Sequence, residues 1–183
     1  MQRILLYGFS GFDCFPRNPS QDLVNDLAKT RWKGVRVDKV IFKVSYTRIE
    51  KKLAVLFKKE EYDAVIGFGL ARNAERIRLE KAARNVHVAT VPDVDGCLKK
   101  EKRILNGAAE VYQTNVRLIG LRDQLLKEGI PARISHDAGG YLCNFTYYLF
   151  LHHFRQSRSR AKCLFIHIPL SSEIACRMER EYP

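Results

Sequence analysis

Cysteine, histidine and glutamate side chains stand at three places in this 183-residue sequence where a catalytic group could form. Cys143 follows a glycine-bearing turn and precedes an amphipathic stretch, so we expect it in the first turn of a helix. There, unpaired backbone N–H groups and the positive end of the helix dipole lower the pKa of a thiol and favour the reactive thiolate. The same N–H groups can hold an oxyanion.

His167 and Glu80 are the candidate partners of this thiol. His167 stands near the end of the last apolar run, where the backbone would fix a general base in position. Glu80 follows an arginine-rich stretch and supplies a carboxylate that could orient the imidazole as a third member. Their order along the chain is no obstacle, because such triads are spatial arrangements.

Each of the three residues also has an ordinary structural interpretation. Free cysteine is among the most buried residue types, so Cys143 could be a small core residue. His167 in an apolar strand could be a hydrogen-bonded core histidine, and Glu80 between basic residues could be a surface charge. From the spacing alone, both interpretations remain open.

The elements that must position these residues alternate along the chain. We predict strands at 3–7, 35–44, 64–68, 132–135 and 163–168, and helices at 20–28 (with Ser20 as N-cap), 49–59 and 142–154, with one long or two shorter helices within 106–128. Strands separated by helices of this length require right-handed crossovers and a mostly parallel sheet covered on both faces. We therefore expect one three-layer α/β/α domain over residues 1–183, with functional groups at the carboxyl ends of its strands.

Composition limits the class of protein. Hydrophobic residues make up 46% of the chain, enough for one large core, and no apolar run approaches the ~20 residues that span a bilayer. The odd number of scattered cysteines indicates reduced thiols, so we expect a soluble cytoplasmic protein without a membrane segment. No histidine has metal-ligand spacing to a cysteine, and we predict no metal. The five cysteines are Cys14, Cys97, Cys143, Cys163 and Cys176.

The chain is strongly basic, with 32 lysines and arginines against 20 acidic residues and a net charge of +12. Basic residues gather within 29–52 and 155–162, but neither region contains a helix-turn-helix, a zinc-finger spacing or an RNP-type aromatic signature. We interpret both regions as solvated faces and expect no nucleic-acid partner.

Four blocks of sequence resemble the pyroglutamyl peptidase I family, also called pyrrolidone-carboxylate peptidases, in order and spacing. They are Gly8-Phe9-x-x-Phe12 with Asn18-Pro19-Ser20; Leu79-Glu80-Lys81-Ala82-x-x-Asn85 with Pro92-Asp93; Gly129-Ile130-Pro131 leading to Tyr141-Leu142-Cys143-Asn144; and Phe165-Ile166-His167-Ile168-Pro169.

This resemblance implies a cysteine peptidase that removes an N-terminal L-pyroglutamyl residue from peptides through a thioester, without a cofactor. By position Cys143 would be the nucleophile, His167 the general base and later acid, and Glu80 the orienting carboxylate. Phe9, Phe12 and Asn18 would belong to the substrate site, where apolar ring faces suit a flat lactam; simple core packing is the alternative for the two phenylalanines. The resemblance also implies a homotetramer.

The chain departs from the family pattern in places. Thr90 stands where the family usually has an arginine, and Val94 where it has an asparagine. The sequence also looks short at the C-terminus, where 172–181 would form about two helical turns. These departures leave an alternative open: a weakly active or inactive relative that acts as a binding protein, with nucleic acid as a partner for its basic faces. The presence of all three triad residues argues against it.

Overall fold

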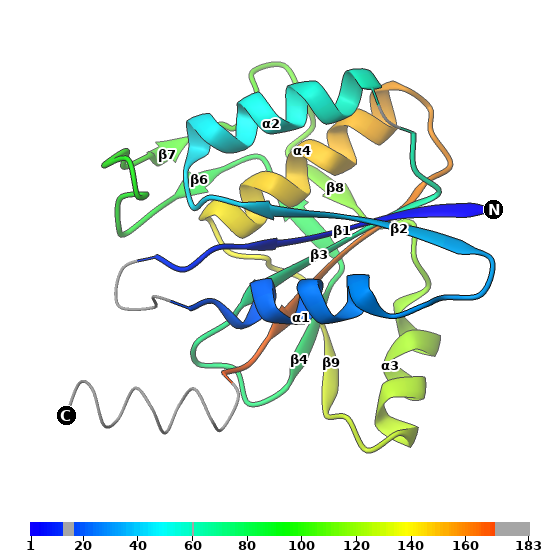
Figure 1. Ribbon diagram of the computed structural model, residues 1–183. Coiled ribbons are helices and arrows are strands. Elements are labelled where there is room, and N and C mark those ends of the chain that lie inside the picture. Colours follow the sequence, from blue (N-terminus) through cyan, green and yellow to red (C-terminus); the bar gives the residue numbers. More distant parts are fainter. Residues whose placement is uncertain (13–16, 60, 171–183) are drawn as a thin grey trace.

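The structure is a computed structural model that describes residues 1–12, 17–59 and 61–170 (Figure 1). Its helices are α1 (Pro19–Lys29), α2 (Tyr46–Lys59), α3 (Leu118–Lys127) and α4 (Leu142–Gln156). Its strands are β1 (Gln2–Phe9), β2 (Val35–Phe42), β3 (Ala64–Leu70), β4 (Ile77–Glu80), β5 (Ala82–Arg84), β6 (His87–Val88), β7 (Lys100–Lys102), β8 (Val111–Gln113), β9 (Ala132–Ser135) and β10 (Lys162–Ile168).

Six strands form the central sheet in the order β2-β1-β3-β10-β4-β9. The first four are mutually parallel, β4 runs antiparallel to β10, and β9 is parallel to β4. Two small ladders, β5 with β8 and β6 with β7, lie outside the sheet. The predicted mostly parallel sheet is confirmed, and the reversal at β4 places a strand end beside the middle of β10.

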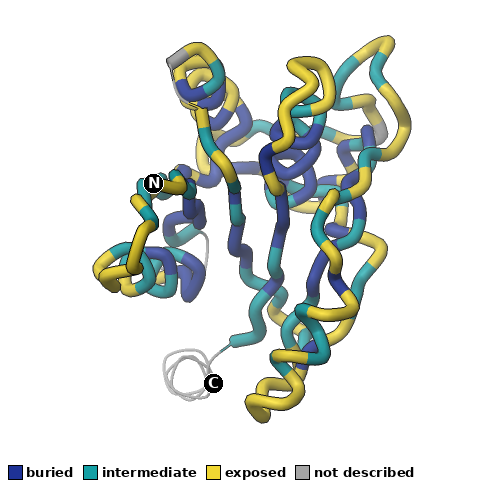
Figure 2. The backbone as a smooth tube through the Cα atoms, turned by 90° about the vertical axis from the view of Figure 1, so that its right-hand side faces the viewer, coloured by how far each residue is buried: buried dark blue, intermediate teal, exposed yellow. Residues whose placement is uncertain are grey.

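Helices cover both faces of the sheet, which gives the expected three layers (Figure 1). Alternate residues of β1 divide between them: Leu5, Tyr7 and Phe9 join the large core under α2 and α4, whereas Leu6 packs against Val24 of α1. A third apolar cluster lies under α3. Figure 2 shows the buried residues between these layers and the exposed residues in the loops and on the outer helix faces.

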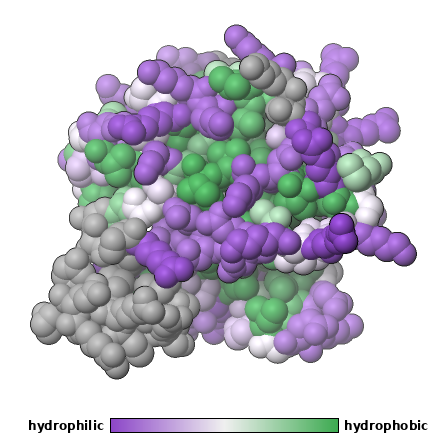
Figure 3. All heavy atoms as spheres, viewed as in Figure 1, coloured by the Kyte–Doolittle hydropathy of each residue, from purple (hydrophilic) through white to green (hydrophobic). Residues whose placement is uncertain are grey.

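The outer surface is mainly hydrophilic on the side seen in Figure 3, with smaller apolar areas between the charged side chains. Some of the basic residues within 29–52 have acidic partners: Lys29 pairs with Asp26, Arg36 with Asp38, and Arg48 forms two hydrogen bonds to Asp95. No helix in the described part of the chain is long and apolar enough to cross a membrane. The described cysteines, Cys97, Cys143 and Cys163, are free.

Two expectations about the elements were wrong, and one strand of the central sheet was not expected. Asn18, and not Ser20, is the N-cap of α1: its side chain accepts from the Ser20 amide, and Pro19 fills the first helical position. The region 106–128 holds a single helix, α3, because its first part pairs as β8 with β5. The four-residue strand β4 was not predicted. The expected turns of 172–181 lie outside the described residues.

Candidate active site

Glu80 and His167 meet on the α4 face of the sheet. In the antiparallel pair of β4 and β10, Glu80 stands opposite Phe165, so His167, two residues further, points to the same face. His167 Nδ1 lies 2.8 Å from Glu80 Oε1. Glu80 is fully buried and His167 is 7% exposed. The surface interpretation of Glu80 is therefore wrong, and its charge has a specific partner.

Cys143 is the second residue of α4, as predicted, and its side chain is half-buried. The N-cap residue Tyr141 makes no side-chain capping hydrogen bond, so the amides of the first turn keep free donors. Gly139 takes a positive φ of 84°, which glycine adopts without strain. A Cβ on Gly140 would lie 2.6 Å from Val88 Cβ, so only glycine lets the turn approach β6.

Two side chains of α4 fix the helix against the strands that follow Glu80. Asn144 accepts from the Arg84 amide at 2.8 Å and donates to the carbonyls of Arg84 and Val86. The Tyr147 hydroxyl donates to the carbonyl of Glu80 at 3.0 Å. Asn144, next to Cys143, and Tyr147, one turn further along the helix, thus fix the thiol relative to Glu80.

Gly69 brings the thiol to the histidine. It pairs with His167 in the ladder of β3 and β10, and a Cβ built on it would lie 2.8 Å from Cys143 Sγ and 2.8 Å from Phe165 Cζ. The sulfur therefore lies directly over Gly69, next to the strand that carries His167. Cys143, His167 and Glu80, the three candidates from the sequence, come together here.

The histidine is held in its protonated form. Burial by itself lowers the pKa of His167, but hydrogen bonds to Cys143 and Glu80 and the charges of these two groups raise it further than burial lowers it, to about 9. A pKa of about 9 makes the ring an imidazolium at neutral pH, beside Glu80 and Cys143. Because Glu80 contacts Nδ1, the other ring nitrogen, Nε2, is left for the thiol side.

We expect Gly69→Ala to lower kcat by about a hundredfold while the protein stays folded, because the new methyl group must displace the sulfur from the histidine. Turnover of the pyroglutamyl amide that the sequence resemblance implies as a substrate, with circular dichroism as the folding check, measures this. Gly120→Ala is the matched control, since a Cβ there meets nothing within 4 Å. Unchanged kcat in Gly69→Ala would contradict the close approach.

The three residues expected at the substrate site occupy different positions. The Phe12 ring lies 6.3 Å from the ring of Tyr141, the residue at the start of α4. Phe9 is buried in an aromatic cluster, 6.4 Å from the ring of Phe165, which in turn contacts His167. Asn18 caps α1 and donates to the Ser10 carbonyl. Phe12 is therefore beside Tyr141 at the N-terminus of α4, while Phe9 and Asn18 support strand β1 and the loop after it.

The loop after β6 contains Thr90 and Val94, and it docks on the site through other residues. The Tyr141 hydroxyl donates to the Pro92 carbonyl at 3.0 Å. Asp93 is buried and accepts from the amides of Tyr46, Asp95 and Cys97. Both Thr90 and Val94 are exposed, so the loop keeps its place without the side chains that the family pattern has there.

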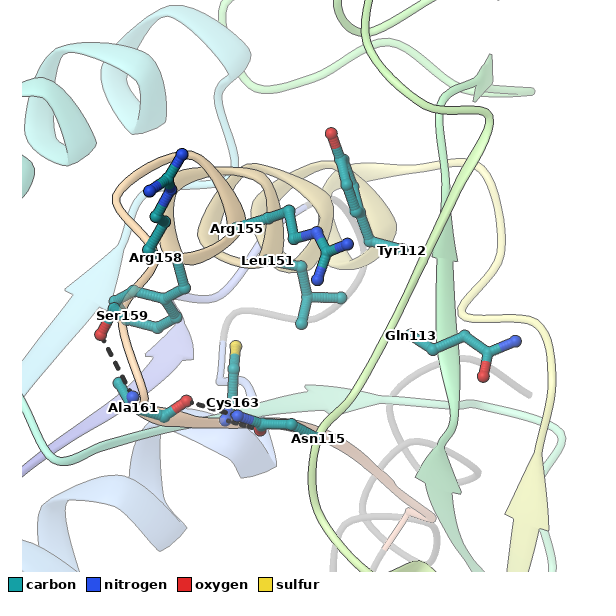
Figure 4. Close-up of a pocket in the computed structure, with 10 residues that line it drawn as sticks. Tyr112, Gln113, Asn115, Leu151, Arg155, Arg158, Ser159, Ala161 and Cys163 are labelled. Carbon is teal, nitrogen blue, oxygen red and sulfur yellow. Dashed lines mark hydrogen bonds between the residues drawn. The ribbon is translucent and has the colours of Figure 1, made fainter.

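A cavity of about 540 Å³ lies near the end of α4, at the end of β10 that is far from His167 (Figure 4). Cys163 is on its floor, about 13 Å along the strand from His167. This cavity is separate from the triad. Among the described residues, no group of three or more histidine, cysteine, aspartate or glutamate side chains could hold a metal ion.

Known proteins resemble the chain over almost its full length. It is 31% identical over 183 residues to the pyrrolidone-carboxylate peptidase of Clavibacter michiganensis, covering 100% of this chain and 85% of the relative. It is 33% identical over 175 residues to that of Oceanobacillus iheyensis, covering 96% and 87%. The crystal structure of the pyrrolidone carboxyl peptidase of Fervidobacterium islandicum AW-1 superposes with a TM-score of 0.93 at 30% identity, covering 98% of this chain and 88% of that one.

The fold is thus that of the solved pyrrolidone carboxyl peptidases. The family model described as pyroglutamyl peptidase matches residues 2–182. The chain belongs to the pyroglutamyl peptidase family, as its four sequence blocks indicated.

Proposed function

We propose that this chain is a cysteine exopeptidase that removes an N-terminal L-pyroglutamyl residue from peptides. The observation that carries the proposal is the buried contact of His167 with Glu80 beside the thiol of Cys143. In this proposal Cys143 is the nucleophile, His167 the general base and acid, and Glu80 the carboxylate that orients the ring.

In the first half of the reaction, the Cys143 thiolate attacks the carbonyl carbon of the pyroglutamyl residue. The carbonyl oxygen becomes an oxyanion, which the free amides in the first turn of α4 stabilise. The intermediate then collapses: the C–N bond breaks, and the departing amine takes a proton from His167. A thioester remains on Cys143, and His167 is neutral.

Water completes the reaction. His167 takes a proton from a water molecule, whose oxygen attacks the thioester carbonyl. The C–S bond breaks, pyroglutamate leaves, and the thiolate and imidazolium are restored. Glu80 stabilises the positive ring at the start and end of this cycle, and its contact with Nδ1 prevents the ring from turning.

We assign two different roles at the substrate site to Phe12, Phe9 and Asn18. The half-exposed Phe12, close to Tyr141, supplies an apolar face for the lactam ring. Phe9 and Asn18 act by holding strand β1 and the loop after it, since both hydrogen-bonding atoms of the Asn18 amide already have protein partners. A flat uncharged lactam suits such a surface better than a charged amino terminus would.

The assay for this function is hydrolysis of a pyroglutamyl-linked chromogenic amide by the purified 183-residue protein. We expect turnover that a thiol alkylator abolishes and a chelator leaves unchanged. The matched proline amide, which has no ring carbonyl, should not be hydrolysed. Absence of turnover by folded protein would leave the alternative, a non-catalytic binding protein; nothing in the comparisons favours that alternative.

We expect Glu80→Gln to move the alkaline limit of activity to lower pH. Glu80 helps to raise the pKa of His167 to about 9, so the unmodified enzyme should keep its imidazolium, and its kcat/KM, up to about that pH. Without the carboxylate the ring loses its proton at lower pH. Profiles of kcat/KM against pH measure the shift, with Asp26→Asn on the exposed side of α1 as the control. Superimposable profiles would argue against Glu80 as the orienting group.

We also propose that the chain works in the cytoplasm. The free thiols of Cys97, Cys143 and Cys163 support a reducing compartment, which keeps a catalytic thiol active. The chemistry proposed for the triad is complete without a cofactor or a metal ion, since nucleophile, acid–base group and oxyanion donors all belong to the chain.

Self-association into a homotetramer is a further proposal. Ile119 and Leu126 lie one heptad apart on α3, 63% and 49% exposed, and Ile130 follows just after the helix. Burial of this surface must outweigh the repulsion between chains of net charge +12, which salt screens. Light scattering should give a tetrameric mass at moderate salt, reduced by Ile119→Lys but not by Val55→Lys on α2. A monomeric mass at high protein concentration would overturn the proposal.

A further inference from the structure

A row of arginines begins beside the catalytic histidine. In the ladder of β4 and β10, Arg78 stands directly opposite His167, so the two side chains share a face and their Cβ atoms lie about 5 Å apart. On the next strand, β9, Arg133 pairs with Arg78. Moving across the sheet from His167, the neighbouring side chains on this face are therefore two guanidinium groups.

The two arginines line a cavity together with the loop between β3 and β4. Its volume is about 330 Å³, and its lining residues are Asn73, Ala74, Glu75, Arg76, Arg78 and Arg133. The loop follows the carboxyl end of β3, and β10 runs parallel to β3, so the cavity opens at the edge of the sheet where His167 lies. Three positive charges and one negative charge surround it.

These charges have no acidic partner in the part of the chain that the structure describes. In residues 1–12, 17–59 and 61–170, Arg76, Arg78 and Arg133 form no ion pair, whereas many other surface arginines do. Arg78 is half-buried, and its Nε atom is shielded from solvent without a hydrogen-bond partner. An anionic group in the cavity gains a charge interaction with all three guanidinium groups, and hydrogen bonds from the exposed guanidinium groups of Arg76 and Arg133.

The position of the cavity identifies which part of a substrate would reach it. His167 gives its proton to the departing amine, so the residue that follows the pyroglutamyl group must lie next to His167 during the reaction. Arg78 is the neighbour of His167 on that strand pair. We propose that Arg76, Arg78 and Arg133 form a subsite for the carboxylate of an acidic side chain on the first residue after pyroglutamate. The inference deepens the proposed function and depends on it.

Guanidinium groups suit this task better than ammonium groups would. A planar guanidinium can donate two parallel hydrogen bonds to one carboxylate, and it stays charged at every physiological pH. Glu75 is the carboxylate among the described lining residues, and it would oppose binding of an anion, but two positive charges remain in excess. The subsite should therefore favour aspartate or glutamate after the scissile bond and be weakened by salt.

The test compares peptide amides that differ in one group. Pyroglutamyl-Glu-amide should have a kcat/KM about tenfold above that of pyroglutamyl-Gln-amide, a ratio that falls as ionic strength rises. Pyroglutamyl-Gln with a free carboxyl terminus separates a side-chain carboxylate from a terminal one, and it should resemble the Gln amide. In the double variant Arg78→Gln/Arg133→Gln the Glu-to-Gln ratio should fall to about one. Arg160→Gln, in the exposed loop before β10, should leave it unchanged.

Three results decide the inference separately from the proposed function. Equal kcat/KM for the Glu and Gln amides, or an unchanged ratio in the double variant, would overturn the subsite while leaving the peptidase standing. If the double variant does not fold, the Glu-to-Gln ratio of kcat/KM is measured instead in Arg76→Gln and in the unmodified enzyme at increasing salt concentration. If no peptide is hydrolysed, calorimetric binding of the two amides to Cys143→Ala still measures the preference, and equal affinities there would refute it.

Discussion

Cys143→Ala is expected to lower kcat/KM for a pyroglutamyl amide by roughly 10⁴-fold or more, with the fold unchanged. In the proposed mechanism the sulfur forms the thioester, and no other described cysteine lies on this face near the histidine; Cys163 is about 13 Å away along β10. Alanine keeps the helix-forming position and removes a half-buried side chain, so little stability should be lost. Hydrolysis, measured together with thermal unfolding, tests both statements.

Cys97→Ala is the matched control, because Cys97 is also free and half-buried but lies in the loop after β6. It should retain most of the activity. Alkylation by iodoacetamide gives an independent measurement: Cys143 should react first in the unmodified protein, and substrate should protect it. Normal turnover by Cys143→Ala, or inactivation by a reagent that leaves Cys143 unmodified, would remove Cys143 from the role of nucleophile.

Strands β3 and β10 were predictable from sequence because they are apolar runs, with two glycines within β3 and Pro169 directly after β10. Strand β4 was not, since its four residues include Arg78 and Glu80, and neither charge indicates burial. Pairing with β10 and β9 makes it a strand, and that pairing is not visible in local sequence. The same limit applies to β8, whose three residues depend on β5 for their conformation.

The three candidate residues could be picked out from residue types and the family resemblance, but the way the fold brings them together could not. We expected the groups outside the carboxyl ends of the strands; instead Glu80 reaches His167 across the face of the sheet, because β4 runs antiparallel to β10. Gly69 and Asn144 were not singled out, although they determine where the sulfur lies. For Gly69 the available signal was a glycine near the end of an apolar strand. That signal points to the site only through the contact with Cys143, which is distant in the sequence.

His167→Ala should lower kcat by roughly 10³- to 10⁴-fold, somewhat less than loss of the thiol, because the free amides of α4 and substrate binding remain. It should also slow alkylation of Cys143 at neutral pH, since the imidazolium that stabilises the thiolate is gone. In the variant Cys143→Ala/His167→Ala the loss should hardly exceed that of Cys143→Ala alone, because both residues serve the same steps. Additive losses would mean that the two act independently.

Measurements of stability separate the proposed catalytic role of His167 from its structural one. Removing the ring leaves Glu80 fully buried without its partner, and Glu80 Oε2 already has no hydrogen-bond partner among the described residues. An uncompensated buried charge costs about 3–5 kcal/mol, so His167→Ala should unfold at a markedly lower denaturant concentration. Glu80→Gln/His167→Ala removes that charge and should recover much of the stability. Its activity should stay low, because the missing acid–base group is not restored. Recovery of activity together with stability would show that His167 serves only to hold the fold.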